Sequence, residues 1–174
     1  MQPASALEMQ SAIGLLEKTP RVLETLLHGA PADVLEWKPG PERWSIREVL
    51  AHLVDLEKLF VERVRSVLEE ETPELPKYSP MGSLLGGPST DATARLARFQ
   101  GLRGELVLLV KDAPASAATR VGTHEELGRV TLAQLLNELA NHDLGHLRQI
   151  AELYRARAFY PNAGPFQRYS APQP

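Results

Sequence analysis

The chain has 174 residues, of which 43% are hydrophobic and 24% charged, as expected of one globular domain. The formal net charge is −3 and no cluster of Lys and Arg lies among aromatic residues, so we expect no nucleic-acid partner. The absence of cysteine excludes disulfides, thiolate nucleophiles and cysteine-based metal sites, which leaves His, Asp and Glu as the metal-binding side chains.

The chain contains neither a secretory signal nor a membrane span that we can identify. The first ten residues, "MQPASALEMQ", lack a basic stretch followed by an apolar run. No apolar segment approaches the roughly 18–20 residues that cross a bilayer. We therefore expect a cytoplasmic protein with no membrane partner.

Four segments have the three- and four-residue apolar spacing of amphipathic helices, at about residues 6–28, 45–70, 90–112 and 131–157. Pro20 predicts a kink in the first helix, or a break after Thr19. The segment "SIRE" is a capping box that begins the second helix at Ser45, and Thr131 with Gln134 forms another at the start of the fourth. No strand alternation and no internal repeat is evident.

The connections differ in character. We expect residues 29–44 to contain a short turn of helix, with Trp37 and Trp44 pinning this segment to the bundle. Residues 77–90 form a long loop, residues 113–129 a connection, and the Pro-rich residues 158–174 an extended tail lying over the bundle. The pattern predicts an all-α fold, a four-helix bundle, in a single domain covering residues 1–174.

Histidines stand out on two of these helices. In "NHDLGHLRQI", His142 and His146 are one turn apart, and at about 100° per residue both point to the core side of the fourth helix. His52 lies at the edge of the apolar stripe of the second helix. Such histidines are compatible with hydrogen-bonded core positions, but two imidazoles at this spacing and a third from a facing helix also suit one metal ion. Imidazole binds several transition metals, so these ligands do not identify the ion.

Three carboxylates lie near these histidines in the sequence. Asp143 falls in the middle of the apolar stripe, where an unpaired carboxylate is costly, so we expect it to have a partner. An imidazole or the segment before the second helix would serve, and so would a backbone or tryptophan N–H. Asp55 and Glu48 flank His52 and are interpreted either as supporting or acid–base groups or as exposed helix carboxylates.

The remaining candidates carry less chemistry. Gly145 weakens the helix by about 1 kcal/mol relative to alanine, which suggests that a neighbouring helix or a ligand approaches there. His28 follows a helix end, where a cation complements the helix dipole. His124 reads as a loop residue, and we assign no catalytic role to either histidine. No phosphate-binding loop, nucleophile elbow or dinucleotide motif is present.

Two segments, "ERWSIREVLAHLVDLEKLFVERVRSVL" and "GTHEELGRVTLAQLLNELANHDLGHLRQI", carry a family resemblance. They resemble the DinB-like family of damage-inducible bacterial proteins, which includes the predicted metal-dependent hydrolases of the YfiT type. The resemblance implies a bundle in up-down-down-up order with a long crossover between helices 2 and 3. It also implies a divalent metal, zinc, nickel or iron, held by His52, His142 and His146, and a homodimer.

Two hypotheses on function follow. Some members of the family are S-transferases or isomerases that use a low-molecular-weight thiol, so the resemblance implies a metal-dependent enzyme that activates such a thiol or water toward a small-molecule substrate. Because the chain has no cysteine, the thiol must be external. The alternative is a non-catalytic, metal-stabilised bundle that acts as a binding or dimerisation module, and the lack of an obvious general base keeps it open.

Overall fold

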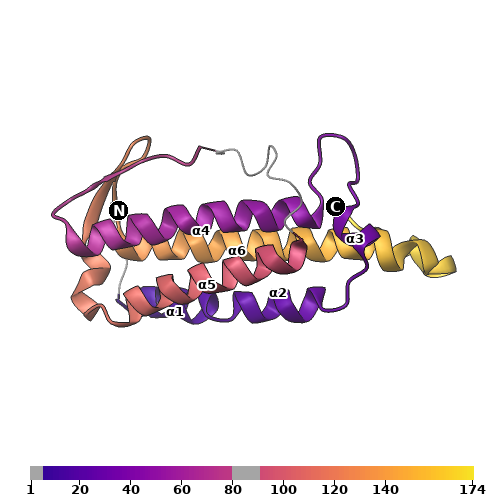
Figure 1. The fold of residues 1–174 in the computed structure, drawn as a ribbon, viewed down its shortest axis with the longest axis horizontal. Coiled ribbons are helices and arrows are strands. Elements are labelled where there is room, and N and C mark those ends of the chain that lie inside the picture. Colours follow the sequence, from indigo (N-terminus) through magenta and orange to yellow (C-terminus); the bar gives the residue numbers. More distant parts are fainter. Residues whose placement is uncertain (1–5, 80–90) are drawn as a thin grey trace.

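A computed structural model of the protein describes residues 6–79 and 91–174 and has the predicted all-α, four-helix-bundle fold (Figure 1). The four rods of the bundle are an interrupted first helix, which comprises α1 and α2, and the helices α4, α5 and α6. A short helix, α3, lies between α2 and α4, as expected. The helices are α1 (Ala6–Leu16), α2 (Thr19–Leu27), α3 (Ala32–Glu36), α4 (Ile46–Glu69), α5 (Ala92–Lys111) and α6 (Leu132–Tyr154).

The order of the helices is up-down-down-up, as predicted. Helices α4 and α5 run in the same direction, and α1, α2 and α6 run in the opposite one (Figure 1). Two side-chain contacts are consistent with this parallel packing of α4 and α5. Near the start of both helices the Arg95 Nη1 atom donates to the Arg47 carbonyl at 2.8 Å, and further along both Arg65 pairs with Glu105 at 2.6 Å. Two consecutive parallel helices require the chain to return along the bundle between them, and the described residues 70–79 begin this crossover.

The helix starts follow from local sequence. The two predicted capping boxes, Ser45 with Glu48 and Thr131 with Gln134, are both formed, and each begins its helix at the next residue. The first helix breaks at residues 17–18, two residues before the predicted position. Pro20 lies in the first turn of α2, where its missing N–H needs no partner, so the break has to precede it.

A small sheet at one end of the bundle was not predicted. The strands are β1 (Glu74–Leu75), β2 (Val121–His124) and β3 (Gly128–Thr131). Strand β1 pairs with β2 in parallel, and β2 pairs with β3 as a hairpin. The interpretation of residues 113–129 as a plain connection is wrong, because strands of two to four residues are too short to show alternation. Gly128 turns the hairpin with φ of 71°.

The expectation of an extended tail is also wrong. Beyond α6 the chain continues in helical turns over Arg155–Phe159, Tyr160–Asn162 and Gly164–Arg168. Proline opens each of the last two turns, where the missing N–H is tolerated. Figure 1 shows this segment continuing past the end of the bundle. Of the predicted loop at residues 77–90, all but the first three residues lie outside the described part of the chain.

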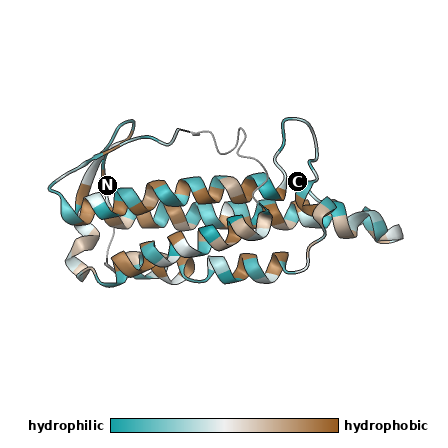
Figure 2. Ribbon diagram, in the orientation of Figure 1, coloured by the Kyte–Doolittle hydropathy of each residue, from teal (hydrophilic) through white to brown (hydrophobic). Residues whose placement is uncertain are grey.

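The core consists of two apolar clusters, to which all four rods of the bundle contribute, and Figure 2 shows hydrophobic residues recurring along these helices. The first cluster is built around α1 and the start of α6, and the second around α2 and the start of α4. Trp37 and Trp44 pack against the second cluster, as predicted. Between the clusters the side chains of Glu57, Arg103 and Asp143 are almost fully buried. No helix in the described residues is long and apolar enough to cross a membrane.

Candidate metal centre

The three predicted histidines lie together between α4 and α6. The Nε2 atom of His142 lies 2.9 Å from Nε2 of His52 and 3.0 Å from Nε2 of His146. In the described part of the chain these three residues form the group that could hold a metal ion, with ligand atoms within 4.8 Å of one another. Antiparallel packing places His52 opposite the pair, and the four-residue spacing stacks the pair on one side of α6.

Hydrogen bonds on the outer ring nitrogens orient two of the imidazoles. The Oε1 atom of Gln149 accepts from Nδ1 of His146 at 2.8 Å, so Nε2 of His146 carries a free lone pair. The Tyr78 hydroxyl lies 3.2 Å from Nδ1 of His52 and can accept from it in the same way. The Nδ1 atom of His142 is buried without a hydrogen-bond partner in the described structure. The outer contacts thus direct the unprotonated nitrogens of His52 and His146 toward the centre of the cluster.

The protonation of these rings also suits a metal. Burial, followed by the charge of neighbouring histidines, lowers the pKa of His52 to about 4 and that of His142 to about 3. Burial lowers the pKa of His146 as well, although Gln149 and Asp143 oppose the shift. All three rings are therefore neutral at pH 7. Neutral imidazole is the form that binds a metal ion.

The donor set fits a divalent ion. The Nε2 atom of His142 lies about 3 Å from the Nε2 atoms of both other histidines. A single ring proton can serve only one of these two contacts, whereas a cation would satisfy all three nitrogens. A tetrahedral ion with metal–nitrogen bonds of about 2.0–2.1 Å separates its ligand nitrogens by about 3.3 Å, so only small side-chain movements are needed.

Aromatic side chains confine the cluster. The indole of Trp44 stacks on the His146 ring at 6.4 Å between centroids, with an interplanar angle of 11°, and lies 5.0 Å from the His52 ring. The Tyr78 ring meets His52 edge-on at 5.4 Å. Sequence reasoning gave Trp44 only a structural role and missed Tyr78, because Tyr78 comes from the crossover, whose path no local pattern predicts.

Beneath the histidines, Arg103 of α5 joins α4 and α6 through a buried ionic cluster. Its Nε and Nη2 atoms donate to the two carboxylate oxygens of Glu57, both at 2.7 Å. Its Nη1 and Nη2 atoms donate to Asp143 at 2.6 and 3.1 Å, and Nη1 also donates to the Leu16 carbonyl at 3.0 Å. All five guanidinium N–H groups therefore have acceptors.

The acceptor at Leu16 exists because of Pro20. In an unbroken helix the Leu16 carbonyl would accept from the N–H of residue 20, and proline has none. The break in the first helix thus supplies a buried acceptor to Arg103. The cluster holds two carboxylates for one guanidinium, and burial accordingly raises the pKa of Glu57.

The partner of Asp143 is therefore Arg103, and neither of the expected kinds of partner is correct. Sequence reasoning missed Glu57 and Arg103, although both show the same feature that singled out Asp143. Each is a charged residue within the apolar face of a helix. Because burying one charge is costly, three such residues on three helices predict one another as partners.

The carboxylates beside His52 do not join the histidine cluster. Glu48 completes the capping box of α4 and pairs with Lys38 at 3.0 Å. Asp55 lies 3.9 Å from Lys58, its Oδ2 atom is buried without a partner in the described structure, and burial raises its pKa.

The expectation about Gly145 is wrong in part, and the one about His124 is wrong. Gly145 is exposed and a Cβ atom there would meet nothing within 4 Å, so no neighbouring helix requires a glycine, and the approach of a ligand stays a prediction. His124 is not in a loop: it ends strand β2 and is only 8% exposed. His28 follows the end of α2, away from the cluster, as its position in the sequence suggested.

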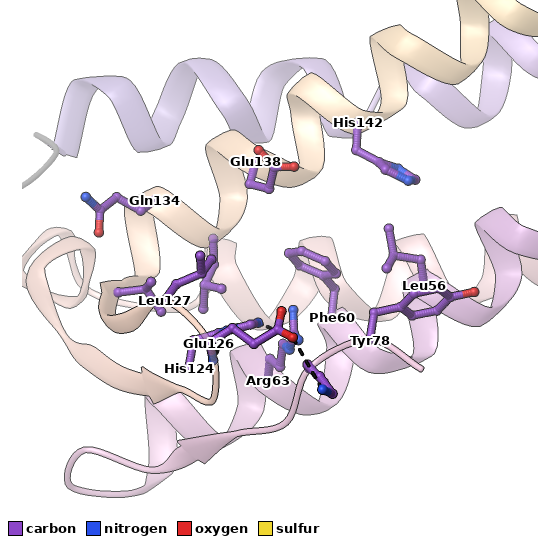
Figure 3. A pocket seen from close by; sticks show the side chains of 13 residues that line it. Leu56, Phe60, Arg63, Tyr78, His124, Glu126, Leu127, Gln134, Glu138 and His142 are labelled. Atoms are coloured by element: carbon purple, nitrogen blue, oxygen red, sulfur yellow. Dashed lines mark hydrogen bonds and ion pairs between the residues drawn. The ribbon is translucent and has the colours of Figure 1, made fainter. Parts of the chain in front are cut away.

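A cavity of about 470 Å³ opens beside the cluster, between α4, α6 and the sheet. Figure 3 shows His142 at one end of it, near Leu56 and Tyr78, and Arg63 and His124 toward the other. Apolar side chains, including Phe60, make up much of the wall. The arrangement gives a small molecule access to His142 from one side.

The fold and the site together define a class of protein, a helical bundle in which two antiparallel helices bring three histidines together and one of them, His142, lines a cavity. The family model of the DinB superfamily matches residues 15–150, and the chain belongs to this superfamily.

Two curated proteins of Bacillus subtilis (strain 168) are similar to the chain. "Uncharacterized protein YuaE" is 27% identical over 141 residues, covering 73% of this chain and 87% of YuaE. "Putative metal-dependent hydrolase YfiT" is 26% identical over 146 residues, covering 82% of each chain. The solved structure of YfiT, described as a probable metal-dependent hydrolase with an unusual four-helix bundle topology, superposes with a TM-score of 0.77 at 24% identity. That match covers 89% of this chain and 90% of YfiT, and it establishes the shared fold.

Proposed function

We propose that His52, His142 and His146 bind one divalent metal ion and that the protein is a metal-dependent enzyme acting on a small molecule in the adjacent cavity. The observation that carries this proposal is the convergence of three neutral imidazoles beside a cavity of substrate size. The predicted hydrolase activity of the relative YfiT supports it. The reaction is transfer of an external thiol to an electrophile or, as the close variant, hydrolysis.

When bound, a divalent ion supplies a Lewis acid that lowers the pKa of a thiol or of water. The protein's own groups do the rest. Gln149 and Tyr78 hold the ring orientation of His146 and His52. Trp44 covers two of the imidazoles, and the apolar wall of the cavity excludes water from the substrate. Imidazole ligands are compatible with zinc, nickel and iron.

Metal content tests the site directly. Protein reconstituted with zinc, nickel or ferrous iron at pH 8 should bind about one ion per chain, measured by elemental analysis after gel filtration. The H142A/H146A variant should lose this ion, whereas H28A, which removes an exposed histidine outside the cluster, should retain it. If the double variant folds and binds the metal as well as the wild type does, the three-histidine site is wrong.

Turnover separates the enzyme from the non-catalytic alternative. Metal-loaded protein should consume a thiol in the presence of an alkylating electrophile, or hydrolyse an activated ester, and H142A/H146A should not. If metal raises the melting temperature but neither reaction is accelerated, a metal-stabilised binding or dimerisation module is the better account. A homodimer and a cytoplasmic location stay predictions.

A further inference from the structure

The end of the cavity away from the metal centre has an excess of hydrogen-bond donors at His124. The backbone N–H of Glu126 donates to Nδ1 of His124 at 3.2 Å, and Nη2 of Arg63 lies 3.1 Å from Nε2 of the same ring. A neutral imidazole has one acceptor nitrogen and one N–H, so it can accept from only one of these two donors. In either tautomer a ring N–H faces another donor, and an acceptor is missing.

The Arg63 side chain also has a donor without an acceptor. It is 6% exposed, its guanidinium lies 5.4 Å from the centre of the Phe60 ring, and Nη2 donates to the Pro76 carbonyl. Its Nε atom is buried without a hydrogen-bond partner, and no carboxylate of the described residues forms an ion pair with it. Burial lowers the pKa of Arg63, as expected of a guanidinium with no counter-ion.

Arg103 provides the comparison within the same bundle. It is buried to a similar degree, but its five N–H groups have acceptors and two carboxylates surround it. A buried arginine is ordinarily paired in this way, because an uncompensated charge costs several kcal/mol. The difference between the two arginines is that Arg63 lines the cavity, where an anion can enter.

The other charges of the cavity do not supply this anion. Lys77 and Glu126 pair with each other at 3.3 Å, and both are exposed. Glu138 is an exposed residue of α6 on the opposite wall, as Figure 3 shows, and it makes no ion pair with Arg63. The cavity thus contains a buried, unpaired cation at one end and mostly apolar side chains between it and the histidines.

We propose that Arg63 and His124 bind an oxyanion, a carboxylate or a phosphate, carried by the small molecule that occupies this cavity. One oxyanion supplies acceptors to the Arg63 guanidinium and to the His124 Nε2–H, and it neutralises the buried charge. The substrate class is an elongated molecule with an apolar middle, an anionic group at one end and the reacting group at the other.

The spacing along α4 indicates the scale of this molecule. His52 and Arg63 are eleven residues apart, which corresponds to about 16 Å along the helix axis. The side chains of Leu56 and Phe60 line the cavity between them. The identity of the occupant as a substrate rests on the proposed function, but binding of the anion needs no metal, so the two ideas can fail separately.

The test uses 4-phenylbutyrate as the probe, 4-phenylbutyramide as its neutral counterpart and inorganic phosphate as the second anion. Metal-free full-length protein is titrated at pH 8, where the metal-centre histidines are neutral and do not attract anions. Calorimetry gives the Kd, and long-range ¹H–¹⁵N spectra report the His124 ring. The butyrate should bind at least tenfold more tightly than the amide and shift the His124 signals.

Variants assign the effect to the site. R63M should weaken butyrate binding tenfold or more, whereas R65M, which removes an exposed arginine of the same helix, should not change it. R63K keeps the positive charge but loses the planar guanidinium, so its affinity for butyrate should lie between those of R63M and R65M. It also tests the site if R63M does not fold. Each variant is also loaded with zinc, since loss of anion binding with unchanged metal binding locates the defect at Arg63.

The outcomes are decisive for the oxyanion site. If only phosphate shifts the His124 signals and R63K weakens phosphate binding, the bound anion is a phosphate. If only the butyrate shifts these signals and R63K weakens butyrate binding, the bound anion is a carboxylate. If the amide binds as tightly as the butyrate, or if R63K and R63M bind both anions like the wild type, the inference is overturned. Loss of metal binding in H142A/H146A with anion binding retained would leave it intact.

Discussion

Replacing Arg103 with methionine tests whether the buried ionic cluster holds the three core helices together. The substitution keeps much of the aliphatic volume but removes five hydrogen bonds, two of them to each carboxylate and one to the Leu16 carbonyl. Glu57 and Asp143, at 0% and 1% exposure, are then left facing each other without a cation. Like charges in a site closed to water are strongly unfavourable.

The expected loss is about 3–5 kcal/mol in the free energy of unfolding, the range for removing one partner of a buried ion pair. Adding five separate hydrogen-bond energies would overstate it, because one carboxylate can take up a proton when Arg103 is gone. A domain of this size is stable by about 5–15 kcal/mol, so the variant should fold with a much lower urea midpoint.

Urea unfolding of metal-free protein, followed by circular dichroism, measures the loss. Arg98→Met removes an exposed arginine from the same helix and should change the free energy by no more than about 0.5 kcal/mol. The triple variant Glu57→Leu/Arg103→Met/Asp143→Leu removes the charges together and should recover most of the stability. If Arg103→Met lowers the free energy of unfolding by less than about 1 kcal/mol, the view that Arg103 compensates the buried charges of Glu57 and Asp143 is refuted.

Three further predictions concern other parts of the fold. Gly122→Ala places a Cβ atom 2.6 Å from Cδ1 of Leu75, so it should destabilise the sheet by about 1–3 kcal/mol, measured by urea unfolding. Gly145→Ala meets no atom within 4 Å and should stabilise α6 by about 0.5–1 kcal/mol, seen as a higher Tm. The pKa values of His52 and His142, about 4 and 3 in the folded chain, lie below the ordinary 6.5, so the unfolded chain binds more protons between these values. The free energy of unfolding of metal-free protein should therefore fall as the pH is lowered from about 6.5 toward 4.

Each of these has a clear contrary result. An unchanged urea midpoint for Gly122→Ala would show that the strands separate at no cost. A lower Tm for Gly145→Ala would mean that a close approach at that position has been overlooked. If the free energy of unfolding falls with pH as steeply in H52A/H142A as in the wild type, these two histidines are not the source of the pH dependence.

Local sequence patterns determined the helices and the three histidines. The effects of a capping box, of apolar spacing and of Pro20 extend over only a few neighbouring residues. The starts of α4 and α6 and the break in the first helix were therefore predictable to within two or three residues. The direction in which His52, His142 and His146 point follows from helical periodicity, which needs no knowledge of the partner helix. Family resemblance then supplied the order of the helices.

Tertiary structure decided which side chains meet across elements. The pairing of Arg103 with Glu57 and Asp143 depends on the parallel packing of α4 and α5 and on a carbonyl freed by Pro20. Tyr78 reaches His52, and Arg63 reaches His124, only because the crossover and the hairpin return to α4. Strands of two to four residues give no periodic signal, and a contact between residues 61 positions apart has no local cause. The histidine cluster was therefore visible in the sequence, whereas its cavity and the unpaired cation within it emerged only from the fold.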